Sequence, residues 1–189
     1  MDPLELFHED RARAREAEDP MAHLCTLANV DEHGIPQMRT LVLREVGQAL
    51  AVFINATSPK WNHLLHTTVI HTYWPSVQVQ FRMQVTTETV PDSVVHESWN
   101  FRPQIPKSMD WFYQQHSAQS SAIASREALI DQIHNVTLPS PLHAPENAKG
   151  LLLHPTEVER LDLTQADGIH DRRRFRLVNA VWQQDVLVP

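Results

Sequence analysis

Alternation of apolar and polar side chains is the clearest pattern in this chain. Between positions 77 and 89, valine, phenylalanine and methionine alternate with glutamine and arginine, which predicts a strand with one apolar and one polar face. Shorter apolar runs bounded by turn residues predict further strands. The predicted strands cover positions 23–30, 36–45, 49–55, 69–73, 77–89, 150–154, 157–163, 170–178 and 181–188.

Helical segments flank this β structure. Asp2 is a favourable N-cap and Pro3 a favourable first helical residue, so an amphipathic surface helix is expected over positions 2–18. About five or six strands in meander order, with helices between them, favour a mainly β, α+β fold built on a small antiparallel barrel. The other predicted helices lie at 58–66, 91–101, 108–116 and 125–134, before a proline-rich loop at 135–148.

Length and composition limit the possible classes of protein. The 189 residues suit one domain over 1–189, with a helical insertion at about 91–134 and a C-terminal β segment at 150–189. The chain lacks an apolar run of the about 20 residues that a membrane helix needs, and its acidic start is unlike a secretory signal. A single cysteine suits the cytoplasm. The net charge of −7 argues against nucleic-acid binding, and the twelve histidines lack metal-ligand spacing, so no metal site is predicted.

Two arginines, Arg39 and Arg44, enclose an apolar strand segment. Further along, Ser58 and Lys60 place a hydroxyl and a third cation at the expected start of a helix. Hydroxyls, backbone N–H groups and a helix N-terminus bind phosphate well, and a lysine strengthens such a site. The segment therefore predicts a phosphate-bearing ligand held without a glycine-rich loop. Taken alone, the two arginines could also be solvated cations at a sheet edge.

A second basic cluster lies near the C-terminus. The residues that share one strand face there are His170, Arg172, Arg174 and Arg176. Such groups repel one another unless an anion or carboxylates lie opposite them. A solvated edge strand accounts for Arg174 and Arg176, whereas a phosphate-bearing ligand accounts better for His170 and Arg172.

An ordered set of motifs runs along nearly the whole chain. In sequence order the motifs are Asp2-Pro-Leu-x-Leu-Phe, Asn29-Val-Asp-Glu-His-Gly-x-Pro, Arg39-x4-Arg44, Asn55-x2-Ser-x-Lys60, Trp74-Pro, Gln80, Arg102-Pro, His170-Asp-Arg172 and the segment 182–189. This set resembles the pyridoxamine 5′-phosphate oxidase family. The resemblance implies an FMN-binding antiparallel split β-barrel that forms a homodimer with FMN at the subunit interface. The implied activity is oxidation of pyridoxamine or pyridoxine 5′-phosphate at C4′ to pyridoxal 5′-phosphate, with O2 as acceptor.

The resemblance also implies roles for individual residues. Arg39, Ser58 and Lys60 resemble the ligands of the FMN phosphate, where charge-assisted contacts are strong. Arg44 stands where the family has a lysine that contacts both flavin and substrate, and Gln115 is expected from the partner subunit. The other implied FMN contacts are Thr40, Leu41, Val42, Leu43, Phe53, Ile54, Gln80 and Arg172. The implied substrate contacts are Arg44, Arg102 and His170, with His170 and Arg44 as catalytic residues.

Several positions depart from the family pattern. Gly168 replaces an arginine over the substrate ring, while Ser98 replaces a tyrosine and Pro106 a serine that contact the substrate phosphate. On the flavin side, Pro59 replaces an arginine and Asp162 a tryptophan. Flavin contacts are thus mostly retained and substrate contacts partly lost. Three functions remain open: the oxidase activity of the family, an FMN-dependent reductase or oxidase acting on another small molecule, and a non-catalytic FMN-binding protein.

Overall fold

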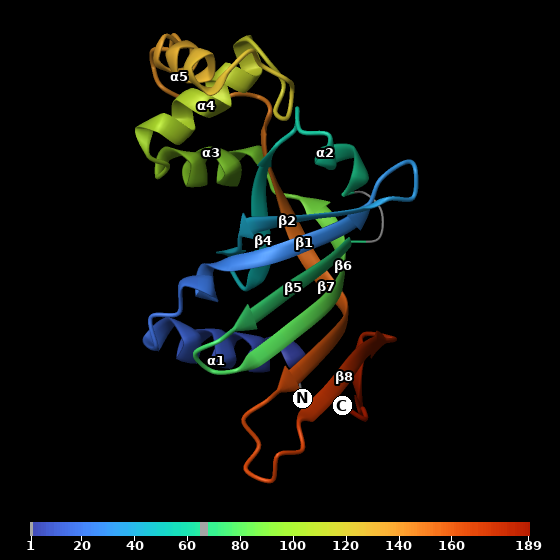
Figure 1. Ribbon diagram of the computed structural model, residues 1–189. Coiled ribbons are helices and arrows are strands. Elements are labelled where there is room, and N and C mark those ends of the chain that lie inside the picture. Colours follow the sequence, from blue (N-terminus) through green and yellow to red (C-terminus); the bar gives the residue numbers. More distant parts are fainter. Residues whose placement is uncertain (1, 65–67) are drawn as a thin grey trace.

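The computed structural model describes residues 2–64 and 68–189 and confirms a mainly antiparallel β fold with flanking helices (Figure 1). The helices are α1 (Pro3–Glu16), η1 (Pro20–His23), α2 (Lys60–His63), α3 (Asp92–Asn100), α4 (Gln104–Gln115) and α5 (Arg126–His134). The strands are β1 (Leu24–Val30), β2 (Pro36–Val42), β3 (Arg44–Val46), β4 (Ala49–Asn55), β5 (Thr68–Trp74), β6 (Val79–Thr89), β7 (Ala148–Asp162), β8 (Asp171–Val178) and β9 (Val181–Val186).

All nine strands of the described residues belong to one antiparallel sheet, so this sheet holds more strands than the five or six expected for the small barrel. Its main path runs β2-β1-β5-β6-β7-β4-β3, and the hairpin of β8 and β9 pairs with β7. Within the described part of the chain, no strand ladder joins β2 to β3, so the sheet is an open, split barrel. Helices α3, α4 and α5 gather at one end of the sheet, and the C-terminal hairpin lies at the other (Figure 1).

The predicted strand at 36–45 is wrong in one respect, because it breaks at Leu43. β2 pairs with β1, whereas β3 pairs with β4, so the chain passes from one ladder to another at this residue. The N–H of Leu43 donates to the carbonyl of His23 at 2.9 Å. The Leu43 side chain is only 2% exposed and packs into the main core. The break therefore places Val42 and Arg44 on either side of a fixed corner.

The two strands predicted at 150–154 and 157–163 form the single strand β7 instead. The register with β6 aligns Gln84 with Glu157 and Val85 with Pro155, which leaves Thr156 as one extra residue. Such a β-bulge lets a strand continue past a residue that cannot donate a ladder hydrogen bond. Pro155 therefore interrupts the ladder without ending the strand.

Two helix predictions also need correction. α4 begins at Gln104 rather than at position 108, with Pro106 in its first turn. Proline is tolerated there because the first N–H groups of a helix have no intrahelical partner. The helix predicted at 58–66 corresponds to the four-residue α2, and positions 65 and 66 lie outside the described residues. No helix within residues 2–64 and 68–189 is long and apolar enough to cross a membrane.

The core divides into two hydrophobic clusters. In the main cluster, Phe7 of α1 packs against Trp74 and Phe81 of the sheet, with ring centroids 5.3 and 5.1 Å apart. Aromatic packing of this kind adds to the free energy gained from burial. The second cluster joins α3 to β7 and the loop before it, and its buried members are Val90, Val95, Trp99, Ala144 and Ala148. The helical end thus has its own small core.

A buried arginine connects α1 to the corner between β2 and β3. Arg11 is 1% exposed, and its guanidinium donates to the carbonyl of Ala22 at 2.8 Å and that of Leu43 at 2.7 Å. A third hydrogen bond, of 2.6 Å, reaches the carboxylate of Glu45. Burial lowers the pKa of Arg11, and the charge of Arg15 adds to that shift. Arg11 therefore satisfies backbone groups that the strand break would otherwise leave unpaired.

Cys25 in β1 should be unreactive in the folded protein. Its side chain is buried, and burial raises the pKa of the thiol to about 12. Because the thiolate is the reactive form, we expect a disulfide reagent such as Ellman's reagent to modify Cys25 only after unfolding in urea. The absorbance of the released chromophore measures the reaction. Rapid stoichiometric modification without urea would contradict the buried position.

Candidate functional site

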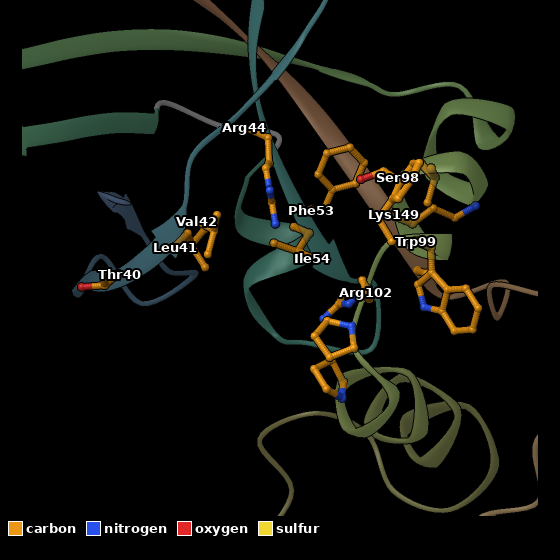
Figure 2. A pocket seen from close by; sticks show the side chains of 15 residues that line it. Thr40, Leu41, Val42, Arg44, Phe53, Ile54, Ser98, Trp99, Arg102 and Lys149 are labelled. Atoms are coloured by element: carbon orange, nitrogen blue, oxygen red, sulfur yellow. The ribbon is translucent and has the colours of Figure 1, made fainter. Parts of the chain in front are cut away.

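A cavity of about 650 Å³ opens between the sheet and the helical end (Figure 2). The sheet contributes six residues that the sequence analysis placed beside FMN, namely Thr40, Leu41, Val42, Arg44, Phe53 and Ile54. α3, α4 and the turn between them contribute Ser98, Trp99, Phe101, Arg102, Pro103 and Pro106. The walls are therefore largely apolar, and the predicted substrate residue Arg102 faces the same space as the predicted flavin strand.

Three cations line this cavity, but two of them already have carboxylate partners. The Nζ of Lys149 lies 2.9 Å from Asp92, and the guanidinium of Arg102 lies 3.3 Å from Asp110. No ion pair of Arg44 occurs among the described residues, and its side chain extends toward the middle of the lining group in Figure 2. Arg44 is thus the cation of the cavity that remains available for an anionic ligand.

A second cavity, of about 470 Å³, brings together Arg39, Ser58 and Lys60. The Nζ of Lys60 donates to the hydroxyl of Ser58 at 2.7 Å and to the side-chain oxygen of Gln119 at 3.2 Å. Arg39 donates through Nη2 to Asn29 at 2.9 Å. Its Nη1 is buried and has no hydrogen-bond partner among the residues that the structure describes. The predicted phosphate ligands therefore share one cavity, where a guanidinium N–H lacks an acceptor.

The electrostatics of this second cavity favour an anion. Burial lowers the pKa of Lys60, and the charge of Arg39 adds to that shift. Burial also lowers the pKa of Arg39. The carboxylate of Asp31, at the rim, is occupied by backbone N–H groups and by the amide of Gln37. Two half-buried cations that contact neutral oxygens are unfavourable until an anion joins them, so the donor set fits a phosphate.

The helix N-terminus that we expected at this phosphate site contributes little. α2 has only four residues, and its N-terminal Pro59 makes no side-chain capping bond. The loop before α2 is instead held by side chains. Thr57 donates to Asn55 at 2.6 Å and accepts the N–H of Gln119 at 3.0 Å. The site is therefore built from side chains rather than from a helix dipole.

Five of the predicted site residues line neither cavity. Leu43 belongs to the main core, as described above. Gln80 lies in β6, in register with Tyr73 and Leu161, and the amide of Gln115 donates to the carbonyl of Thr137 at 3.1 Å. The remaining two, His170 and Arg172, belong to the C-terminal hairpin region and lie at the end of the sheet away from α3–α5 (Figure 1).

The basic cluster on the C-terminal hairpin is balanced by carboxylates of the same chain. Arg172 contacts Glu159 at 2.9 Å, and Arg174 and Arg176 contact Asp185 at 2.9 and 3.0 Å. Glu159 is only 5% exposed. The sequence interpretation that a phosphate-bearing ligand balances this cluster is therefore not needed to explain it.

Two departures from the family pattern have structural roles in this chain. Gly168 has a φ of +74° in a turn closed by its N–H on the carbonyl of Gln165, a conformation that glycine adopts at little cost. Asp162 accepts hydrogen bonds from Thr164 at 2.6 and 2.9 Å and from Arg160 at 3.1 Å. These contacts stabilise the chain as it leaves β7. Among the described residues, no group of three or more potential metal ligands is placed to hold a metal.

Sequence reasoning missed residues that shape the larger cavity. Asp110 pairs with Arg102 and also accepts the indole N–H of Trp99 at 2.8 Å. A Cβ atom at Gly150 would lie 2.9 Å from Val90 and 3.0 Å from Phe53, so glycine lets these two side chains meet behind the cavity wall. These contacts join residues that are at least eight positions apart in the sequence, and no motif marks them.

Comparison with known proteins identifies the family. No protein-family model matches the chain. A curated pyridoxine/pyridoxamine 5′-phosphate oxidase from Pseudomonas syringae pv. tomato is 33% identical, over 100% of this chain and 89% of the relative. PhzG from Burkholderia lata 383, solved with tetrahydrophenazine-1-carboxylic acid, has a TM-score of 0.83 at 20% identity, covering 100% of this chain and 93% of PhzG. A pyridoxamine 5′-phosphate oxidase-related, FMN binding protein from Nostoc punctiforme has a TM-score of 0.79 at 18% identity, covering 100% and 99%. The two structures share the fold, and the curated relative shows that this chain belongs to the pyridoxine/pyridoxamine 5′-phosphate oxidase family.

Proposed function

We propose that this protein is an FMN-dependent oxidoreductase. The observation that carries the proposal is the cavity in which Arg39 and Lys60 lie together, with a buried guanidinium N–H for which the described residues provide no acceptor. A terminal phosphate supplies that acceptor and offsets the repulsion between the two cations. The names of the family relatives, which are oxidases, and of the FMN-binding structural neighbour support the same proposal.

In this proposal the smaller cavity binds the FMN phosphate, and the larger cavity binds the rest of FMN and the substrate. Arg39, Ser58 and Lys60 hold the FMN phosphate, while Thr40, Leu41, Val42, Phe53 and Ile54 line the space for the ribityl chain and the ring. When bound, FMN supplies a two-electron acceptor, and the protein contributes orientation and charge. The apolar wall formed by α3 and α4 excludes water from the substrate. Arg44 orients the anionic part of the substrate.

We further propose that the active form is a cytoplasmic homodimer. His170 and Arg172 lie on the hairpin at the far end of the sheet, away from the larger cavity of their own protomer. A second copy related by two-fold symmetry would bring this region, or Gln115 of α4, to the site of its neighbour. In that arrangement Glu159 fixes the guanidinium of Arg172 in position through its 2.9 Å contact. The proposed catalytic residue His170 and the proposed flavin contact Arg172 then come from one subunit and Arg44 from the other.

The names of the relatives suggest the first reaction to test. Pyridoxamine 5′-phosphate, O2 and water would give pyridoxal 5′-phosphate, ammonia and hydrogen peroxide. Pyridoxine 5′-phosphate and O2 would give pyridoxal 5′-phosphate and hydrogen peroxide. In both reactions the substrate carbon C4′ loses two electrons and O2 gains them. Arg44 and His170 are the proposed catalytic residues on the substrate side.

A second candidate reaction is the same two-electron chemistry on a different small molecule. The ion pair between Arg102 and Asp110 favours it, because the guanidinium proposed to hold a substrate phosphate already faces a carboxylate. Ser98 and Pro106, which line the same space, add at most one hydroxyl to that corner. The two reactions differ in the substrate and share the cofactor site.

Purified protein should be yellow, with one FMN per subunit. The flavin absorbance spectrum of the protein, and of the supernatant after heat release, measures the stoichiometry. Turnover is then followed as formation of hydrogen peroxide and pyridoxal 5′-phosphate from pyridoxamine 5′-phosphate. Colourless protein that ignores added FMN would end the flavin proposal, whereas yellow protein without this turnover would select the second reaction.

A further inference from the structure

The corner of the larger cavity around Arg102 contains a buried carboxylate. Asp110 is 5% exposed and lies on α4, where it accepts the indole N–H of Trp99 at 2.8 Å. The guanidinium of Arg102 approaches the same carboxylate oxygen at 3.3 Å, and its side chain is 38% exposed toward the cavity. Burial raises the pKa of Asp110, while Arg102 and the indole N–H act in the opposite direction. The carboxylate thus depends on Arg102 as its only cationic partner in the described structure.

The ion pair between Arg102 and Asp110 weakens the attraction of this corner of the cavity for an anion. A phosphate ester approaching Arg102 would also approach the carboxylate of Asp110, and the like charges of the phosphate and the carboxylate would repel each other. If the phosphate drew Arg102 away, Asp110 would remain buried without its ionic partner, which is unfavourable. The Arg102 corner is therefore close to neutral, although an arginine lines it.

The remainder of the wall favours an aromatic ligand. Trp99, Phe101, Pro103 and Pro106 surround the corner, with Val95 beside them. The ammonium of Lys149 pairs with Asp92 at 2.9 Å. Arg44, on the opposite side, is the lining cation for which no carboxylate partner occurs in the described residues. The cavity thus combines apolar, partly aromatic walls with one available positive charge.

We propose that the substrate of this cavity is a non-phosphorylated aromatic compound with a single carboxylate, which Arg44 binds, and that Asp110 excludes phosphate esters by neutralising Arg102. This inference rests on the proposed function and selects its second candidate reaction over oxidation of pyridoxamine or pyridoxine 5′-phosphate, since it concerns the substrate of the same flavoenzyme. It assigns Asp110 a role in specificity, exerted through Arg102 and not through contact with the reacting atoms.

A matched pair of aromatic probes tests the proposal on FMN-loaded protein. 1-Naphthoate carries one carboxylate, and 1-naphthyl phosphate carries a phosphate ester on the same ring system. Titration calorimetry should show that the wild-type protein binds 1-naphthoate more tightly than 1-naphthyl phosphate. In Asp110→Asn, where the amide can still accept the indole N–H, affinity for 1-naphthyl phosphate should rise roughly tenfold or more. Affinity for 1-naphthoate should change by less than about threefold.

Control variants distinguish an effect of the Asp110 charge on ligand binding from a loss of folded protein. Asp131→Asn, on the exposed face of α5, should leave both affinities unchanged. Arg44→Met should abolish binding of 1-naphthoate. If Asp110→Asn does not fold, the double variant Arg102→Met, Asp110→Asn decides, because it removes both charges of the pair and leaves the corner neutral, so affinity for 1-naphthyl phosphate should change by less than about threefold.

Two results would overturn the inference. One is a wild-type protein that prefers 1-naphthyl phosphate and loses that preference in Arg102→Met. The other is an Asp110→Asn variant that folds but gains no affinity for the phosphate. The flavin content, measured on the same samples, distinguishes these results from a failure of the proposed function. A protein that holds FMN and prefers the phosphate contradicts only the inference.

Discussion

The double substitution Arg39→Met and Lys60→Met is expected to abolish retention of FMN during purification. In the proposed site each cation contributes a charge-assisted hydrogen bond to the FMN phosphate, worth about 1.5–3 kcal/mol. Loss of both should weaken FMN binding by roughly 10²- to 10⁴-fold. Fluorescence quenching of free FMN during titration with apo-protein measures the dissociation constant.

The same substitution should leave the stability of the apo-protein nearly unchanged. Burial lowers the pKa of both cations, so their charged forms are disfavoured in the fold before a ligand binds. We expect the melting temperature of the apo-protein to stay within about 4 °C of wild type, which corresponds to roughly 1 kcal/mol for a chain of this length. Arg126→Met, at an exposed position of α5, is the matched control and should retain FMN. Undiminished FMN binding by the double variant would place the phosphate elsewhere.

Arg11→Met is expected to lower the free energy of unfolding by about 3–5 kcal/mol. The substitution leaves the carbonyls of Ala22 and Leu43 without their side-chain donor in a buried region. Glu45, whose side chain is 32% exposed, loses its shortest ionic contact but can be solvated again. Most of the loss therefore arises at the backbone corner between β2 and β3. Urea denaturation followed by circular dichroism measures it.

Helix α1 also contains an exposed arginine, Arg13, which serves as a control for the loss of one positive charge. Arg13 pairs with Asp10 at 3.2 Å and its side chain is 52% exposed. Solvent screens such a pair, so Arg13→Met should cost less than about 1 kcal/mol. Equal losses in the two variants would mean that the buried contacts of Arg11 do not stabilise the corner. Because Val42 and Arg44 flank that corner, a destabilised Arg11 variant should also bind FMN less tightly.

Features that depend on local pattern could be predicted from the sequence. The alternation in β6 gave its two faces correctly, and its apolar residues are buried. The break at Leu43 could not be predicted, because it depends on which strands β2 and β3 pair with. An apolar run of three residues is equally compatible with one continuous strand. The bulge at Thr156 is likewise a property of the pairing with β6, because Pro155 marks an interruption of the ladder but does not show whether the strand continues beyond it.

The candidate site likewise contains features that could be predicted from the sequence and features that could not. The ordered motifs grouped Arg39, Ser58 and Lys60, and the structure brings these side chains to one cavity. The ion pairs of Arg172 with Glu159 and of Arg102 with Asp110 were not foreseen. A basic residue in a sequence shows its own charge but not which carboxylate the fold brings beside it. For this reason the sequence overstated the number of cations available to ligands.

The separate hydrophobic cluster beneath α3 has a consequence for how this lineage can diversify. Val95 and Trp99 pack on Ala144 and Ala148, and not on the aromatic centre around Phe7 and Trp74. Substitutions at distant positions that share no packing partners have nearly additive effects on stability. The helical end can therefore acquire changes such as a new carboxylate while the sheet keeps its register and the side chains that we propose to bind FMN. Because the two clusters are separate, substitutions at the helical end can change which substrate is bound without destabilising the sheet.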